Sequence, residues 1–211
     1  MRRHVLAAIA APVALLLAAS AGVTLAQQMP PPVTDAAQVP AGHYTVDVHH
    51  ATLLVTVKHM GLAHSTFRLD KVDAGFDYDP AKPDASKVSA TIDANSFDQG
   101  DPAISTQFAK EFLDAPNHPQ ITFASTSLHR TDGTHGVLNG NLTLAGVTKP
   151  VALNVTFDGF RPASNFGAAR AGFSASGVVK RSDFGIGAKM PPAAIADDIN
   201  VILEIEFTKA P

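Results

Sequence analysis

Four histidines fall within sixteen positions, and they are the side chains in this sequence best suited to metal chemistry. They are His49, His50, His59 and His64. Three imidazoles with an open fourth position would suit zinc. Adjacent residues of a strand point to opposite faces, so His49 and His50 cannot easily serve one site. We therefore expect structural histidines and no metal, and we keep a His-dependent metal-binding enzyme as the alternative.

A second polar pattern lies near the C-terminus, where Arg181 and Asp183 flank Ser182 ahead of Phe184. A guanidinium group matches the geometry of a phosphate and can bind it through two hydrogen bonds. The same residues could equally form a structural pair that stabilises a turn. Both interpretations stay open from the residues alone.

Several classes of chemistry are excluded or disfavoured by composition. The chain has no Cys, which excludes disulfides, thiolate metal sites and a cysteine nucleophile. No nucleophile elbow or glycine-rich phosphate loop is present. The formal charge of −3 argues against binding to nucleic acid, which needs a concentrated basic face. We therefore expect no catalytic residues and no cofactor.

The first 26 residues have the pattern of an export signal. Two arginines precede an apolar run at residues 5–21, and small residues lead to Ala26. We expect cleavage after Ala26, with cleavage after Ala21 as the alternative. The run is short for a membrane anchor, which needs roughly 20 apolar residues. After cleavage the chain would carry a formal charge of −5, would not span a membrane and would be exported.

Residues 27–42 contain four prolines among Ala and Gln, and they predict a flexible leader. From residue 43 to residue 211 the pattern predicts one domain, because apolar and polar residues alternate as in half-buried strands. We expect about eight strands. Turn signals between them are Asp132-Gly133, Asn139-Gly140 (read as a turn or a bulge), Gly146 and Asp158-Gly159.

Residues 101–114 differ from the rest, because Ile104, Phe108 and Phe112 recur at helical spacing. The sequence therefore predicts one helix inserted among the strands. Strands with one apolar face each can close into a barrel or stack as a sandwich. The low aromatic content and the absence of Trp fit a barrel without large plugs, although periodicity alone also allows a packed core.

Five segments in order resemble the YceI family, and the resemblance covers about residues 44–207. The segments are HATLLVTVKHMG at 50–61, VSATIDANSFD at 88–98, FLDAPNHPQITFAST at 112–126, LNGNLTLAGVTKPVALNVTF at 138–157 and KRSDFGIG at 180–187. The chain departs from the family pattern at Ala51, where Ser is usual, at Ser65, where Gly is usual, and in the helix at residues 104–109.

The resemblance implies an all-β protein with an eight-stranded, antiparallel, lipocalin-like barrel and one inserted helix. It also implies a periplasmic, non-catalytic binding protein that holds a polyisoprenoid or similar long-chain lipid. A structural or stress-related protein with a filled core is the alternative, and a homodimer stays open.

In this interpretation, His59 and Arg181 would contact the lipid head group, since His59 shares the parity of Val55 and Val57. The apolar lining would come from inward-facing residues of the strands and the helix. These are Val55, Val57, Phe67, Ile92, Phe108, Phe112, Phe123, Leu142, Leu144, Val155, Phe173, Phe184 and Leu203.

Overall fold

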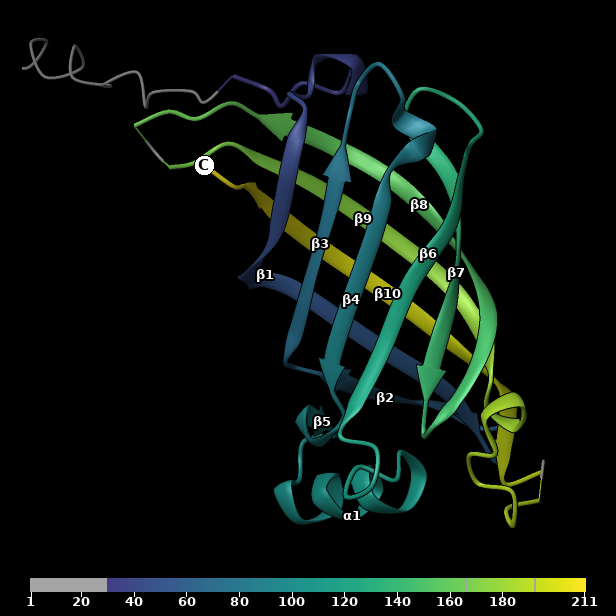
Figure 1. Ribbon diagram of the computed structural model, residues 1–211. Helices are drawn as coiled ribbons and strands as arrows, with labels where there is room; N and C mark the ends of the chain where they lie inside the picture. Colours follow the sequence, from purple (N-terminus) through teal and green to yellow (C-terminus); the bar gives the residue numbers. More distant parts are fainter. Residues whose placement is uncertain (1–29, 166, 192) are drawn as a thin grey trace, which may run out of the picture. The chain divides into compact units, whose positions relative to one another are not determined.

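Eight antiparallel strands close into a barrel in the computed structural model, which describes residues 30–165, 167–191 and 193–211 (Figure 1). The ring runs β10-β9-β8-β7-β6-β4-β3-β1, and pairing of β1 with β10 closes it. The bounds are β1 Gly42–His59, β3 Val72–Tyr78, β4 Lys87–Asp93, β6 Gln120–Arg130, β7 His135–Leu144, β8 Val147–Arg161, β9 Arg170–Lys180 and β10 Ile195–Lys209. The predicted all-β, eight-stranded barrel with one helix is confirmed. The expected signal peptide lies outside the described residues.

Strand β1 changes neighbours along its length. Its first residues pair with β3, and residues 54–59 pair with β2 (Ala63–Leu69), which in turn pairs with β5 (Phe97–Asp98). The register with β10 shifts between Val46 and Ala51, so the intervening residues form a bulge. The described residues also form four 3-10 turns: η1 Ala36–Gln38, η2 Pro83–Ala85, η3 Ala94–Ser96 and η4 Arg181–Phe184.

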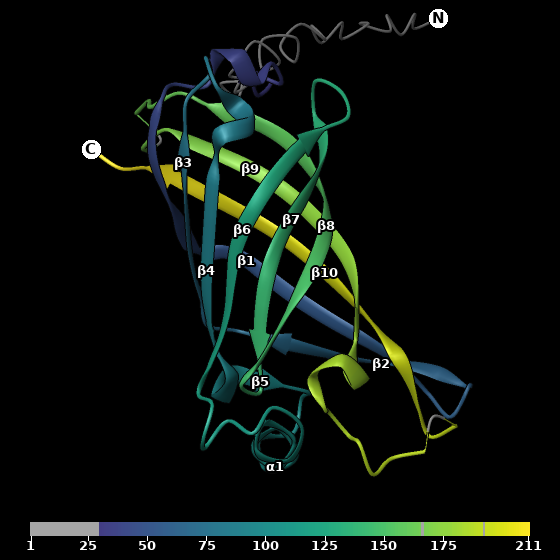
Figure 2. The same ribbon diagram turned by 45° about the vertical axis from the view of Figure 1, so that its right-hand side comes forward.

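The helix α1 spans Pro102–Phe112 and confirms the helix expected within residues 101–114. Asp101 caps it, because its carboxylate accepts hydrogen bonds from the amides of Ala103 (2.9 Å) and Ile104 (3.2 Å). Pro102 fits the first turn, where no amide hydrogen is needed. In both ribbon views α1 lies across the lower end of the barrel (Figures 1 and 2).

The opposite end of the barrel is closed by a cluster of aromatic rings. Tyr44 stacks on Phe76 with ring centroids 4.8 Å apart, and Phe207 meets Phe76 edge-on at 5.0 Å. Phe173 joins both Phe157 (5.4 Å) and Phe207 (6.0 Å). The expectation of a barrel without aromatic plugs is therefore wrong at this end. Few aromatic residues suffice because five strands each contribute one ring to the same layer.

Part of the stretch expected to be a flexible leader covers this aromatic cluster. Val39 is only 4% exposed. The Tyr44 hydroxyl donates to the Pro40 carbonyl at 2.8 Å, and the Tyr78 hydroxyl donates to the Ala36 carbonyl at 2.7 Å. Burial raises the pKa of Tyr44 to about 12, so this donor keeps its proton at physiological pH. The structure thus differs from the expectation, because the hydroxyl groups of buried Tyr44 and half-buried Tyr78 donate to backbone carbonyls of the segment.

Two of the four turn signals mark turns, namely Asp132-Gly133 between β6 and β7 and Gly146 between β7 and β8. Asp158-Gly159 instead marks a bulge inside β8, and Asn139-Gly140 lies within β7, opposite a bulge in β6. Gly140 is needed there for space. A Cβ atom at this position would lie 2.3 Å from the Phe123 ring and 2.7 Å from the Ala124 carbonyl oxygen.

We expect Gly140→Ala to lower the free energy of unfolding by about 1–3 kcal/mol, because the added methyl group overlaps Phe123 and the backbone beside it. Gly133→Ala is the matched control, since nothing lies within 4 Å of its Cβ position. That control should stay within about 0.5 kcal/mol of the parent. Urea unfolding of the three proteins measures this, and equal stability of both variants would contradict the packing described for β7.

Candidate ligand-binding cavity

The barrel encloses a cavity of about 850 Å³ with an apolar lining. Twelve of the thirteen residues expected to line it do so: Val55, Val57, Phe67, Ile92, Phe108, Phe112, Phe123, Leu142, Leu144, Val155, Phe173 and Leu203. The thirteenth, Phe184, is buried but lies in η4 and is not part of the lining. Strand β9 ends at Lys180, so the alternation that placed Phe184 inside does not reach it.

Aromatic rings also lie at the helix end of the cavity. Phe108 of α1 lies 5.0 Å from Phe112 and 6.5 Å from Phe67, and Phe97 of β5 lies 5.0 Å from Phe67, measured between ring centroids. All four rings line the cavity. The sequence reasoning missed Phe97, whose two-residue strand is too short to show a period, and Met190, which lies in a loop.

Most polar residues of the lining lie toward the helix end. Gln99 and Glu111 come from around α1, Thr66 comes from β2, and His59 ends β1. His59, which is predicted to face the interior, belongs to the lining but is also exposed to solvent at the end of β1. An amphiphile inside the barrel would find polar partners at this end and an aromatic floor at the other.

Arg181 also lines the cavity, but its guanidinium group is already engaged. It is 7% exposed and donates to the carbonyl oxygens of Ile186 (2.9 Å), Gly187 (3.0 Å), Ala196 (3.1 Å) and Ile195 (3.2 Å). Four of its five N–H groups are therefore used on the backbone. The expected head-group contact is corrected accordingly, because binding a phosphate would require breaking these bonds.

The expected partnership of Arg181 with Asp183 does not form either. The carboxylate that stabilises η4 is Asp197, which accepts from the Ser182 amide and hydroxyl, both at 2.9 Å. These two hydrogen bonds lower the pKa of Asp197. The segment at residues 180–187 therefore forms a structural turn. The carboxylate that stabilises this turn comes from the following strand, β10.

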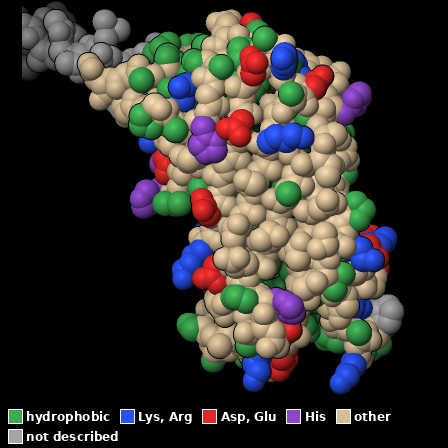
Figure 3. All heavy atoms as spheres, viewed as in Figure 1, with side chains coloured by type: hydrophobic (Ala, Val, Ile, Leu, Met, Phe, Trp, Pro, Cys, Tyr) green, Lys and Arg blue, Asp and Glu red, His purple; other side chains and the backbone are tan. Residues whose placement is uncertain are grey.

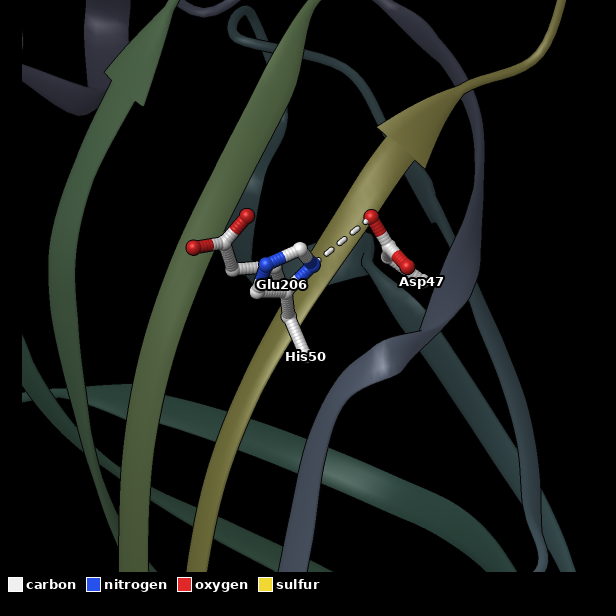
Figure 4. Close-up of side chains that lie close together, drawn as sticks. All are labelled: Asp47, His50 and Glu206. Carbon is white, nitrogen blue, oxygen red and sulfur yellow. Dashed lines mark hydrogen bonds and ion pairs between the residues drawn. The ribbon is translucent and has the colours of Figure 1, made fainter.

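The histidines named in the sequence do not gather into a metal site. His49 and His50 are exposed on the β1 bulge, whereas His59 and His64 lie at the β1–β2 hairpin. Among the residues that the structure describes, only Asp47, His50 and Glu206 bring three potential ligand atoms within 4.8 Å of one another (Figure 4).

In this cluster the positive charge between the two carboxylates comes from the guanidinium group of Arg170. Its Nη1 lies 2.6 Å from Asp47 Oδ2 and 3.1 Å from Glu206 Oε2. The His50 ring lies 3.1 Å from the Asp47 carboxylate. Burial alone would raise the pKa of Asp47, but hydrogen bonds from the His49 amide and the His50 ring, with the charge of Arg170, outweigh it and lower the pKa. We interpret the cluster as a clamp that fixes the bulge to β9 and β10.

The chain belongs to the YceI family, whose domain model, described as a YceI-like domain, matches residues 44–207. A UPF0312 protein of Pectobacterium atrosepticum is 37% identical over 160 residues, covering 74% of this chain and 80% of that protein. A UPF0312 protein of Pseudomonas aeruginosa is 33% identical over 174 residues, covering 81% of this chain and 89% of that protein.

Solved structures share the barrel. BcnA of Burkholderia cenocepacia is 29% identical with a TM-score of 0.67, covering 76% of this chain and 98% of that one. A polyisoprenoid binding domain from Saccharophagus degradans is 14% identical with a TM-score of 0.60, covering 81% and 100%. That second likeness establishes the fold alone. Among the described residues, no helix has the length and apolar character needed to cross a membrane.

We expect Arg170→Gln to destabilise the fold by about 1–3 kcal/mol at neutral pH, because Asp47, only 11% exposed, loses its charged partner. Lys180→Gln is the matched control. Its partner Asp198 lies at 2.7 Å with both side chains more than half exposed, so its loss should leave stability essentially unchanged. Denaturant unfolding measures both, and equal effects would contradict the clamp.

The same comparison has a defined pH dependence. The pKa of Asp47 is lower in the folded protein, so its stabilising effect is present above the unfolded value of about 4 and is lost as pH falls through the folded value. The stability difference between the parent protein and Arg170→Gln should therefore shrink below about pH 4. A difference that stays constant down to strongly acidic pH would show that Asp47 ionisation is not involved.

Proposed function

We propose that this protein is an exported, non-catalytic binding protein that holds a long-chain polyisoprenoid or similar lipid inside its barrel. The observation that carries the proposal is the apolar cavity of about 850 Å³. Ligand pockets in proteins span roughly 300–1,000 Å³, so this one has room for a sizeable molecule. Such a cavity is at odds with the alternative of a filled core.

The lining selects for an apolar occupant. Protein interiors pack densely, and a buried water needs two to four polar partners, which a wall of Val, Leu, Ile and Phe does not offer. In the described part of the chain, no buried side-chain nitrogen or oxygen lacks a hydrogen-bond partner. The cavity would therefore bind a hydrocarbon chain more favourably than water or a polar metabolite.

Burial of the chain alone gives useful affinity. Each buried CH₂ group contributes about 0.8 kcal/mol, so ten such groups contribute about 8 kcal/mol before the cost of ordering the ligand. That energy corresponds to roughly micromolar binding. Head-group chemistry is not required for binding, which agrees with an Arg181 whose hydrogen bonds already go to the backbone.

Membership in the YceI family supports this proposal. The polyisoprenoid binding domain from Saccharophagus degradans has a barrel of the same fold. Its sequence identity to this chain is low, so the likeness supports the fold only. Export rests on the sequence pattern of residues 1–26, the periplasmic location rests on the resemblance to the family, and both belong to the proposal. No geometry among the described residues favours the His-dependent metal enzyme.

We expect Ala175→Phe to weaken binding of geranylgeraniol, an isoprenoid alcohol used as the probe, by about tenfold or more, because Ala175 lines the cavity and a larger side chain would occupy the ligand's space. Ser176→Phe is the matched control, since the neighbouring side chain on β9 points outward and is exposed. Displacement of a fluorescent apolar dye from the protein by added geranylgeraniol measures both.

The parent protein and Ser176→Phe should bind equally. Absence of binding to the parent protein would contradict the proposed function. Equal binding by Ala175→Phe, with its fold verified by circular dichroism, would place the ligand outside the cavity.

A further inference from the structure

The hairpin between β1 and β2 presents large apolar side chains to solvent. Met60 is 59% exposed and Leu62 is 80% exposed. Met60 and Gly61 both have positive φ, and the Leu62 amide donates to the His59 carbonyl at 2.9 Å, so the chain reverses in a tight turn. Such exposure of Leu and Met at a turn has no packing role in the isolated chain.

The described residues of the loop between η4 and β10, namely 187–191, 193 and 194, lie beside this turn. The Met60 amide donates to the Ala194 carbonyl at 2.8 Å. The loop is mostly Gly, Ala, Pro and Met, and Pro191 is exposed. Arg181 binds the carbonyls on both sides of it, at Ile186 and Ile195 among others. The engaged guanidinium group therefore holds an apolar loop in place.

The turn and the loop together adjoin the cavity. His59, directly before the turn, and Met190, within the loop, both belong to the cavity lining. Figure 2 shows the β1–β2 hairpin and this loop side by side at the lower right, at the same end of the barrel as α1. We call residues 60–62, 187–191, 193 and 194 the apolar rim.

Lysines flank the apolar rim. No Asp or Glu occurs within residues 58–67 or 184–196. Directly beyond the second segment, Asp197 is hydrogen-bonded to Ser182 and Asp198 is paired with Lys180. Lys58 and Lys189 lie in these segments, and neither forms an ion pair with any residue that the structure describes. At the lower right of Figure 3, Lys or Arg side chains stand among hydrophobic ones.

We propose that the apolar rim docks on the surface of an anionic lipid bilayer and so brings the cavity to the source of its ligand. This inference rests on the proposed function, since it names the surface from which a lipid-binding barrel would load. Apolar side chains flanked by lysines are the combination that interfacial membrane binding requires. Leu62 and Met60 would enter the headgroup region while Lys58 and Lys189 meet lipid phosphates.

A second copy of the chain fits the rim less well. A stable protein interface buries about 800 Å² on each partner, which two large exposed side chains and a short loop of small residues do not supply. A bilayer needs only shallow insertion together with charge attraction, and each lysine near an anionic surface strengthens binding by about fivefold. The observations therefore favour the bilayer.

Co-sedimentation of the full chain with vesicles of phosphatidylethanolamine and phosphatidylglycerol tests the proposal. The protein should bind these vesicles, bind phosphatidylcholine vesicles more weakly, and release with rising salt. Leu62→Asp should lower vesicle binding by about tenfold or more. Val48→Asp is the matched control, because Val48 is 63% exposed but lies on the β1 bulge away from the rim, and it should bind as the parent does.

Geranylgeraniol titration without vesicles separates the two proposals. Leu62→Asp should keep parent-like binding of this probe, because Leu62 is not part of the cavity lining. Vesicle binding that Leu62→Asp leaves unchanged, or no vesicle binding at all, would overturn the docking proposal while leaving probe binding intact. Concentration-dependent self-association that Leu62→Asp abolishes, without vesicle binding, would also overturn it in favour of a second copy.

Discussion

Closure of the sheet between β1 and β10 is the constraint on which the rest of the structure depends. Eight antiparallel strands joined in a ring leave no free edge, and the ring is wide enough that side chains line the interior without filling it. The unfilled space must then be closed at its ends. Aromatic rings and the segment around Val39 close one end, whereas α1 and two short strands partly cover the other.

The two ends of the cavity therefore differ, because aromatic rings close one end and α1 partly covers the other. The aromatic floor around Phe76 offers mostly apolar contacts, while His59, Gln99 and Glu111 line the cavity toward α1. A lipid would therefore enter tail first and leave its polar part near the helix. Arg181 serves this end indirectly, because its guanidinium group fixes the loop whose residue Met190 lines the cavity.

Much of this could be predicted from the sequence, because strand alternation fixes which side chains face inward. The alternation alone predicts that Val55, Leu142 and Leu203 face inward, whereas the resemblance to the YceI family implies that they line a cavity. The prediction was wrong at Phe184, because strand alternation ends before this residue, which lies in a 3-10 turn. It was also wrong at Gly159, where a turn was expected and the structure has a β-bulge. The role of Arg181 could not be read either, since its partners are carbonyl groups that carry no sequence signal.

The central claim is that the cavity holds an isoprenoid or similar lipid when the protein is made in cells. The most direct measurement is mass spectrometry of an organic extract from protein purified without detergent, with Ala175→Phe purified in parallel. We predict a long-chain isoprenoid in near-stoichiometric amount from the parent protein and a much smaller amount from the variant. Lipid-free parent protein that also takes up no added polyprenyl compound would contradict the claim.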